Sequence, residues 1–316
     1  MSEVKKRRKR HKRKKTKVEF FIHYLIIRAV IFFVMLMPVQ RSLNLAAFLG
    51  RCLWKHYKRG RIRAIDNLRA SYPNETEQWY ESVGKRSFEQ VVMLVIDILY
   101  TPKLVRKDNW REFSHFTNTE YAKWIIHEHK GALMVTGHYG NFEIVGYMLG
   151  LFGFDINSVA RPLDNPYMND YLYGVRERHG QKILNKKGAS NEFGDILQSG
   201  ATLGFIGDQD AGSRGIFVDF FGRKASAYKS IAIAALYYNV PIIIGITRRV
   251  ENRFFFEVEL EQIIMPADWK DKDDPIRWVS QEYNSALERA IRKDPTQYWW
   301  LHRRWKTRPK NELAQE

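Results

Sequence analysis

Residues 132–143 read ALMVTGHYGNFE, a strand-like run followed by a glycine-containing turn and the start of a helix. Ala132–Thr136 is a short apolar run that predicts a buried strand, and Gly137 and Gly140 permit a tight turn after it. The apolar residues that follow Asn141 have helical spacing. A buried strand that turns directly into a helix is the repeating unit of an α/β protein, so we expect a largely parallel sheet.

The same alternation continues towards the C-terminus. Further buried strands are predicted at Ile156–Ala160, Thr202–Ile206 and Ile242–Thr247, and helices at 142–151, 167–179, 189–199 and 226–238. Residues 253–260 alternate as a strand does, and we expect them to pair antiparallel at an edge of the sheet. Residues 64–129 are predicted to be helical with a break at 71–74. The predicted fold class is α/β, with a mainly parallel central sheet flanked by helices.

The composition is that of a globular protein whose charge is unevenly distributed. The chain has 316 residues, 45% of them hydrophobic, which is enough to bury a sizeable core. The net charge of +17 lies in residues 1–63, and residues 64–316 are balanced. A nucleic-acid-binding domain needs a basic folded surface, so this distribution argues against one. The single cysteine, Cys52, excludes internal disulfides and a cysteine metal cage.

The N-terminal region has the pattern of a membrane anchor. Phe20–Met37 is apolar except for His23 and Arg28, and as a helix it is about 27 Å long, just short of a hydrocarbon core. A cleavable signal peptide is not expected, because no small-residue cleavage site follows. Basic residues flank the segment on both sides, which favours a shallow or re-entrant anchor over a clean span.

A second apolar stripe follows the anchor. Its residues have helical spacing and comprise Leu45, Phe48, Leu49, Cys52 and Leu53. An amphipathic helix of this kind lies in the plane of a membrane interface. The alternative interpretation is an ordinary helix whose stripe packs into the core.

The turn after the first strand carries the main candidate for chemistry. His138 follows the carboxyl end of that strand and Glu143 lies in the first helical turn, where open α/β sheets bind ligands. His138 could act as general base on a hydroxyl while Glu143 fixes its tautomer. The alternative is a loop histidine beside a glutamate that favours the helix start. No third ligand supports a metal site, since His127 and His129 lie on a polar stretch.

Several ordered motifs then make the sequence recognisable. The run His-Tyr-Gly-Asn-Phe-Glu resembles the HxxxxD/E motif of glycerolipid-type acyltransferases, in the form found in the lipid A biosynthesis lauroyl/myristoyl acyltransferase family of the lysophospholipid acyltransferase-like superfamily. Later matches are residues 160–162 with 165–166, 176–180, 207–210, 218–222, Ala225, 241–243 and 299–306. The resemblance spans about residues 20–308 and implies a glycerol-3-phosphate acyltransferase-like fold.

This resemblance implies direct transfer of a fatty acyl group from an acyl thioester to a hydroxyl of a lipid A precursor or related glycolipid. The donor would be acyl carrier protein or acyl-coenzyme A, and no metal or organic cofactor is implied. Residues 1–17 are then a polybasic tail, 18–63 the membrane-anchor and amphipathic helices, and 64–316 the catalytic domain. The expected location is the cytoplasmic face of a bacterial inner membrane, with an anionic membrane surface and no nucleic acid as partner.

The resemblance also assigns site residues. His138 and Glu143 are the expected catalytic pair, and the expected substrate-binding residues are Arg176, Asp208, Arg161 and Asn141. Asp208 follows a strand and falls on the same sheet edge as His138, where it would hold Arg176 or substrate. Each has a structural alternative: an ion pair with Asp164 or Glu177 for the arginines, a loop cap for Asp208 and a helix cap for Asn141.

Two aromatic groups have open roles. Phe220 and Phe221 either line an acyl pocket or fill the core. Trp299, Trp300 and Trp305 lie among basic residues and resemble a membrane-interface belt.

Two other functions remain open at this stage. A lysophospholipid or phosphatidylinositol-mannoside acyltransferase has the same histidine-to-acid motif. A polybasic membrane-surface or nucleic-acid-binding protein would use the N-terminal tail instead.

Overall fold

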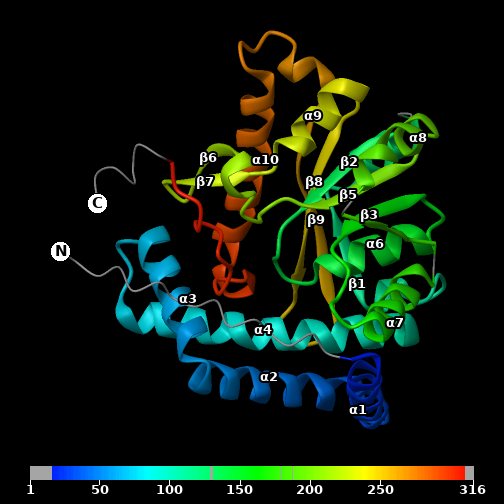
Figure 1. The fold of residues 1–316 in the computed structure, drawn as a ribbon, viewed down its shortest axis with the longest axis vertical. Helices are drawn as coiled ribbons and strands as arrows, with labels where there is room; N and C mark the ends of the chain where they lie inside the picture. Colours follow the sequence, from blue (N-terminus) through cyan, green and yellow to red (C-terminus); the bar gives the residue numbers. More distant parts are fainter. Residues whose placement is uncertain (1–15, 129–130, 179, 187, 310–316) are drawn as a thin grey trace.

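The computed structural model describes residues 16–128, 131–178, 180–186 and 188–309, and a seven-stranded sheet forms its centre (Figure 1). The strand order is β1-β9-β8-β2-β5-β3-β4. The bounds are β1 Ser114–Thr117, β2 Ala132–Thr136, β3 Ile156–Ala160, β4 Lys182–Asn185, β5 Thr202–Ile206, β8 Ile242–Arg249 and β9 Phe256–Ile264. The polybasic tail, up to residue 15, lies outside the described residues.

The expected α/β architecture is confirmed. Strands β8, β2, β5, β3 and β4 are parallel to one another, and the predicted bounds of β2, β3 and β5 match the structure. The β2 side chains Leu133 and Val135 are fully buried on one face of the strand, and Ala132 is fully buried on the other, as a strand covered on both faces requires. Helix α6 (Phe142–Leu151) begins directly after the turn, as predicted.

The expectations about the sheet edge and the segments around it need correction. Strand β9 pairs antiparallel with β8 as expected, but it is not an edge strand, because β1 pairs with its outer side. Residues 64–129 are therefore not wholly helical. A two-stranded hairpin of β6 (Ile216–Phe220) and β7 (Arg223–Ala227) also went unpredicted, and it delays the start of α9 to Lys229.

The turn of this hairpin carries residues that do not signal a hairpin in the sequence. Phe221 and Gly222 both have positive φ, which two-residue hairpin loops require. A phenylalanine in that position lacks the Asn-Gly or Asp-Gly signal by which such turns are recognised.

Helices cover both faces of the sheet (Figure 1). Helix α9 (Lys229–Tyr238) packs on β2 and α10 (Pro275–Lys293) on β8 and β9, whereas α6 packs on β3 and β8. The first four helices form a layer at the bottom of Figure 1, and their bounds are α1 Lys17–Met35, α2 Val39–His56, α3 Lys58–Ser71 and α4 Glu77–Leu104. The other helices are α5 Glu120–Glu128, α7 Pro166–Glu177 and α8 Phe193–Gln198.

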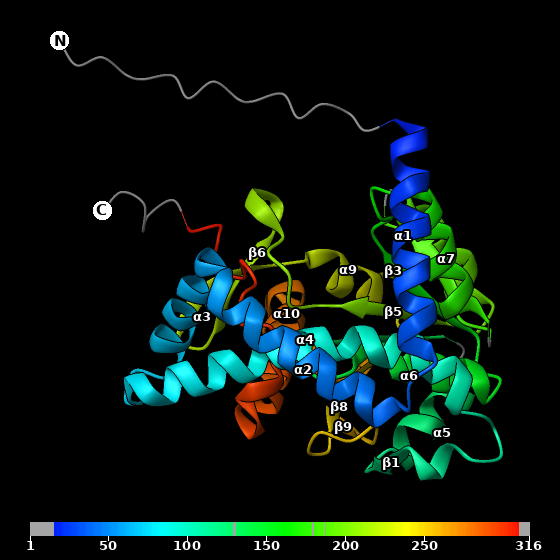
Figure 2. The same ribbon diagram turned by 90° about the horizontal axis from the view of Figure 1, so that it is seen from below.

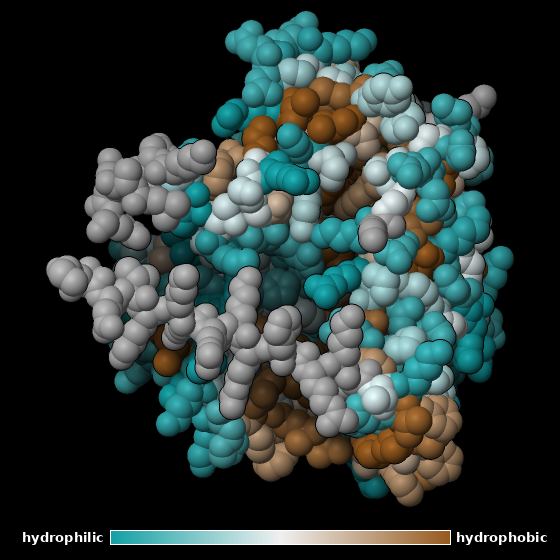
Figure 3. All heavy atoms as spheres, viewed as in Figure 1, coloured by the Kyte–Doolittle hydropathy of each residue, from teal (hydrophilic) through white to brown (hydrophobic). Residues whose placement is uncertain are grey.

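Helix α1 is long and apolar enough to cross a membrane by length and composition, and none of its residues is buried. One side of it lies along α7 (Figure 2). Asn165 donates a hydrogen bond to the carbonyl of Phe20, and the guanidinium of Arg28 lies 4.2 Å from the ring centre of Tyr171. The rest of α1 forms a hydrophobic patch at the lower right of Figure 3.

Helix α2 has two apolar sides. Leu43, Ala46 and Trp54 are buried, and α2 lies along α4. The stripe predicted from the sequence is a different one, and its side chains at Leu45, Phe48, Leu49 and Leu53 are exposed. The amphipathic stripe therefore faces outward rather than into the core.

The turn after β2 is clamped by the C-terminal segment. The backbone N–H of Gly140 donates to the carbonyl of Gln297 at 3.0 Å, and that of Trp299 donates to the carbonyl of His138 at 3.1 Å. Gln297 also hydrogen-bonds the backbone of Arg249 through both ends of its amide. The turn is thus held from β8 and from the C-terminus together.

Gly140 is the position in this turn that tolerates no side chain. Its φ is +51°, and an added Cβ would lie 1.9 Å from the carbonyl oxygen of Thr247. We expect Gly140→Ala to lower Tm by at least about 4 °C, since the left-handed conformation alone costs about 1–2 kcal/mol and the clash adds to it. Differential scanning fluorimetry in detergent measures this. Gly174→Ala is the control, because an added Cβ there meets nothing within 4 Å, and an equal loss in both variants would contradict the prediction.

Candidate active site

The register between β2 and β5 brings two predicted residues together. Thr136 is opposite Ile206 at the carboxyl ends of these parallel strands, and His138 and Asp208 follow at the same offset. Nδ1 of His138 donates to Oδ1 of Asp208 at 2.7 Å, and the backbone N–H of His138 donates to Oδ2 at 2.8 Å. Asp208 is fully buried and His138 nearly so. The carboxylate therefore fixes both the ring and the turn that carries it.

Electrostatics keep Asp208 ionised. Burial alone raises the pKa of Asp208, but the charge of His138 and its hydrogen bonds outweigh burial and hold that pKa well below its usual range. The ionised carboxylate of Asp208 accepts from Nδ1–H of His138, which leaves Nε2 as the nitrogen that can exchange a proton with a substrate. The amide nitrogen of Gln209 lies 3.4 Å from Nε2.

Glu143 does not take the orienting position expected from the sequence. Its carboxylate is held by Arg176 through two hydrogen bonds, one from Nε at 2.8 Å and one from Nη2. Asp208 occupies Nδ1 of His138 instead. Glu143 and Arg176 are both mostly buried. The five-residue spacing of His138 and Glu143 allowed their contact, but α6 carries Glu143 towards α7.

The remaining predicted residues have different outcomes. The expected contact between Asp208 and Arg176 is not formed, because Asp208 binds His138 and Arg176 binds Glu143. The alternative ion pair of Arg176 with Glu177 or Asp164 is not formed either. Arg161 is exposed at the surface, 3.6 Å from Asp164, and is not brought to His138. Asn141 caps α6 by accepting from the backbone N–H groups of residues 143 and 144. Its Nδ2 is buried and has no partner among the described residues.

The structure adds His302, which the sequence did not single out. Its ring lies 4.2 Å from that of His138, centre to centre. Burial lowers the pKa of His302 to about 4, and His138 contributes to the same shift, so the ring is neutral at pH 7. The residue belongs to the closing motif at 299–306, which was recognised only as a resemblance. Because His302 lies far from His138 along the chain, no local sequence pattern indicates their contact.

The tryptophans of that closing motif do not form a membrane-interface belt. Trp300 and Trp305 are buried in the core, and Trp299 contacts the rings of His138 and Phe142. Phe220 and Phe221 are likewise core residues rather than an acyl pocket, with Phe220 packed against Trp305.

His138, Asp208 and His302 are the group among the described residues whose ligand atoms could approach a metal, lying within 4.8 Å of one another. Nδ1 of His138 donates its proton to Asp208, so only Nε2 of that ring could ligate a metal. Both oxygens of Asp208 are already used by His138. The geometry thus favours a hydrogen-bonded base over a metal centre. His127 is exposed beside Glu128, and His129 lies outside the described residues.

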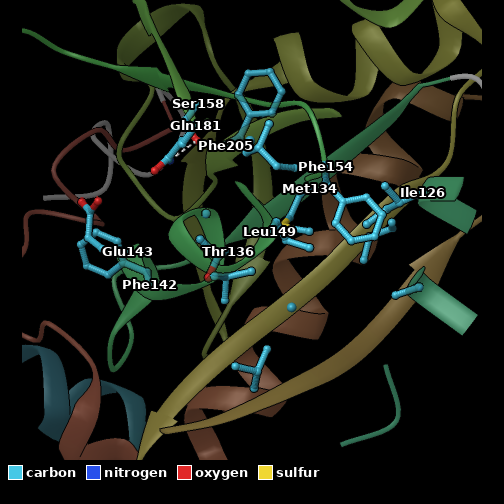
Figure 4. Close-up of a pocket in the computed structure, with 18 of the residues that line it drawn as sticks. Ile126, Met134, Thr136, Phe142, Glu143, Leu149, Phe154, Ser158, Gln181 and Phe205 are labelled. Carbon is cyan, nitrogen blue, oxygen red and sulfur yellow. Dashed lines mark hydrogen bonds between the residues drawn. The ribbon is translucent and has the colours of Figure 1, made fainter. Parts of the chain in front are cut away.

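A large apolar cavity opens beside this pair. Its volume is about 400 Å³, and it extends between the sheet and helices α5 and α6. Figure 4 shows Phe142 and Glu143 at one end and Ile126 and Phe154 at the other. The ring of Phe142 lies 5.2 Å from that of His138. The cavity can therefore hold a long apolar chain with one end close to the histidine.

Comparisons with known proteins agree with this geometry. A Haemophilus influenzae protein named lipid A biosynthesis acyltransferase is 25% identical over 287 residues, covering 89% of this chain and 88% of its own. The Escherichia coli lipid A biosynthesis lauroyltransferase is 25% identical over 89% of this chain and 90% of its own, and the palmitoleoyltransferase 24% identical over 81% and 82%. The model of the bacterial lipid A biosynthesis acyltransferase family matches residues 8–307. The chain belongs to that family of acyltransferases.

Proposed function

We propose that this protein transfers a fatty acyl group from an acyl thioester to a hydroxyl of a lipid A precursor, with His138 as general base. The observation that carries the proposal is the buried His138–Asp208 pair at the end of an apolar cavity of about 400 Å³. The cavity suits the acyl chain, and the relatives named above favour lipid A over a lysophospholipid or phosphatidylinositol-mannoside acceptor. The donor is acyl carrier protein or acyl-coenzyme A, which present the same thioester.

The reaction needs a base and positioning, because a thioester is already activated. Nε2 of His138 removes the proton of the acceptor hydroxyl as its oxygen attacks the thioester carbonyl carbon. The carbon–sulfur bond then breaks, and the imidazolium returns the proton to the leaving thiolate. Asp208 stabilises the imidazolium while it exists. Acyl transfer is thus completed with no net change in the protein.

Arg176 has a donor left for the oxygens of the substrate. Arg176 uses Nε and Nη2 on Glu143, and its Nη1 donates to no described residue. Nδ2 of Asn141 is also left without an acceptor. Asn141 does not line the apolar cavity, so we assign substrate contact to Arg176, which does line it, since a donor preorganised at the carbonyl stabilises the oxyanion. Glu143 then acts by fixing the guanidinium of Arg176.

The base assignment is tested by one truncation and two isosteric variants. We expect His138→Ala and Asp208→Asn to lower kcat by about 10²- to 10⁴-fold, because the first removes the base and the second removes the carboxylate that orients it. Glu143→Gln should have a smaller effect on kcat and raise KM, since it frees Arg176. Product mass spectrometry with purified enzyme in detergent measures all three. Asp195→Asn, an exposed residue of α8, is the control.

If Glu143 rather than Asp208 orients His138, the Glu143 and Asp208 variants should show the opposite result. A Glu143→Gln variant as inactive as His138→Ala, together with a normal Asp208→Asn variant, would show that Glu143 orients the base and that Asp208 does not. No transfer by the wild-type protein from any thioester to any hydroxylated lipid would refute the proposed function.

The depth of the apolar cavity should set acyl length. Ile126 lies at the end away from Glu143 (Figure 4), so Ile126→Phe should shorten the preferred chain. Each CH₂ excluded from an apolar site costs about 0.8 kcal/mol, or about fourfold in relative kcat/KM. Competition among thioesters of graded length measures the preference. Ile233→Phe, on the exposed side of α9, is the matched control, and the same profile in both variants would contradict this role of the cavity.

We further propose that α1 and the exposed stripe of α2 bind the inner membrane, with the catalytic domain on the cytoplasmic face. The polybasic N-terminus would add attraction to anionic headgroups. The contacts of α1 with α7 at Phe20 and Arg28 favour a shallow anchor, because a helix packed on the domain cannot be surrounded by lipid along its length.

The single cysteine tests this orientation. A polarity-sensitive fluorophore on Cys52, in the α2 stripe, should shift to the blue in anionic vesicles and be quenched by brominated acyl chains. The control carries Cys52→Ser with Ile233→Cys, whose label on α9 should stay in water. Equal emission from both labels in vesicles would place the α2 stripe outside the membrane.

A further inference from the structure

A second cavity, of about 240 Å³, lies beside the His138–Asp208 pair. Asp208 and His302 line it, and none of its lining residues lines the apolar cavity. The ring of His138 contacts His302 of this cavity and Phe142 of the apolar one. His138 thus stands between two cavities of different character, one apolar and one lined by charged side chains.

The acidic groups of the second cavity are already satisfied. Both oxygens of Asp208 accept hydrogen bonds from His138. Both oxygens of Asp210 accept from Thr307, one from the backbone N–H and one from the hydroxyl. The donors of Thr307 are neutral and leave Asp210 charged, so three cations face two carboxylates in the cavity, which keeps an excess of positive charge.

The basic groups of the same cavity lack counter-ions. Arg303 and Lys306 are exposed and form no ion pair with any described residue. Arg304 is 1% exposed, and its guanidinium donates only to neutral groups, the carbonyls of Gln209 and Ser226 and the amide of Asn284. Its Nε is a buried donor with no partner in the described part of the chain.

An anion would resolve this imbalance. A buried charge without a counter-ion is costly, and a bound anion offsets that cost while accepting from the surrounding donors. Arg176 offers no comparable site, because Glu143 already neutralises it. The C-terminal segment that carries these cations lies close to β7 and α10 (Figure 1), where Ser226 and Asn284 hold Arg304.

We propose that the cavity formed by Arg303, Arg304 and Lys306 binds a phosphate group of one of the two substrates while the acyl chain occupies the apolar cavity. This inference rests on the proposed function. Phosphate is the chemistry that the phosphopantetheine arm of a thioester donor shares with a phosphorylated glycolipid acceptor. Either source places the reacting carbonyl and hydroxyl at His138, between the two cavities.

The test removes the two exposed charges and leaves buried Arg304 intact. Arg303→Gln with Lys306→Gln is compared with Lys270→Gln and Lys272→Gln, an exposed pair in the loop before α10. Each full-length variant is assayed in detergent with thioesters of phosphopantetheine and pantetheine, and with the acceptor before and after phosphatase treatment. We expect KM to rise about tenfold for one phosphorylated substrate, with kcat nearly unchanged, and no rise for its phosphate-free form.

The substrate whose KM rises identifies the source of the phosphate. A rise for the phosphorylated acceptor alone assigns the cavity to the glycolipid, and a rise for phosphopantetheine thioester alone assigns it to the donor. Kinetic constants within twofold of the control pair for all four substrates would overturn the inference while leaving acyl transfer intact.

Binding gives a readout that does not depend on turnover. Inorganic pyrophosphate should raise Tm of the wild type and of the Lys270/Lys272 control, and raise it much less in the Arg303/Lys306 variant. Equal shifts in all three would contradict the cavity as an anion site. Wild-type protein that binds pyrophosphate but transfers no acyl group would refute the proposed function and retain the anion site.

Discussion

The parallel register of β2 and β5 is the constraint on which the site depends. Because Thr136 lies opposite Ile206, the residues two positions further on, His138 and Asp208, meet at the same sheet edge. Side chains alternate between the faces of a strand, so a shift of one residue would send one of them to the other face. The cost of burying Asp208 is met by the two hydrogen bonds from His138, and the same bonds orient the imidazole ring.

Some charged side chains around His138 and Asp208 form ion pairs, and others have no counter-ion. Arg176 is paired with Glu143 at the wall of the apolar cavity, so that region contributes hydrogen-bond donors with little net charge. Across His138, Arg304 is buried among neutral partners, and Arg303 and Lys306 are exposed nearby. Under the proposed function, this separation would let one histidine serve a substrate with both a long apolar chain and an anionic group.

The C-terminal segment joins fold and site. Gln297 and Trp299 hold the turn that carries His138, His302 lies against its ring, and Trp300 and Trp305 fill the core. Its aromatic and basic composition is also that of a membrane-interface belt, and composition alone could not separate the two roles. The amphipathic stripe of α2 shows the reverse case, since its spacing predicted an outward apolar surface and Leu45 and Phe48 are exposed.

Sequence patterns alone predicted the α/β class, the exact bounds of three strands and the helix after His138. They also located the excess positive charge before residue 64. These are local properties, because the spacing of apolar residues and the residue types in a turn affect only nearby parts of the chain. Only the tertiary structure decided that His138 pairs with Asp208, that Glu143 pairs with Arg176, and that His302 and Arg304 reach the site. These contacts join residues far apart in the chain, and strand register and helix direction set them, which no local pattern encodes.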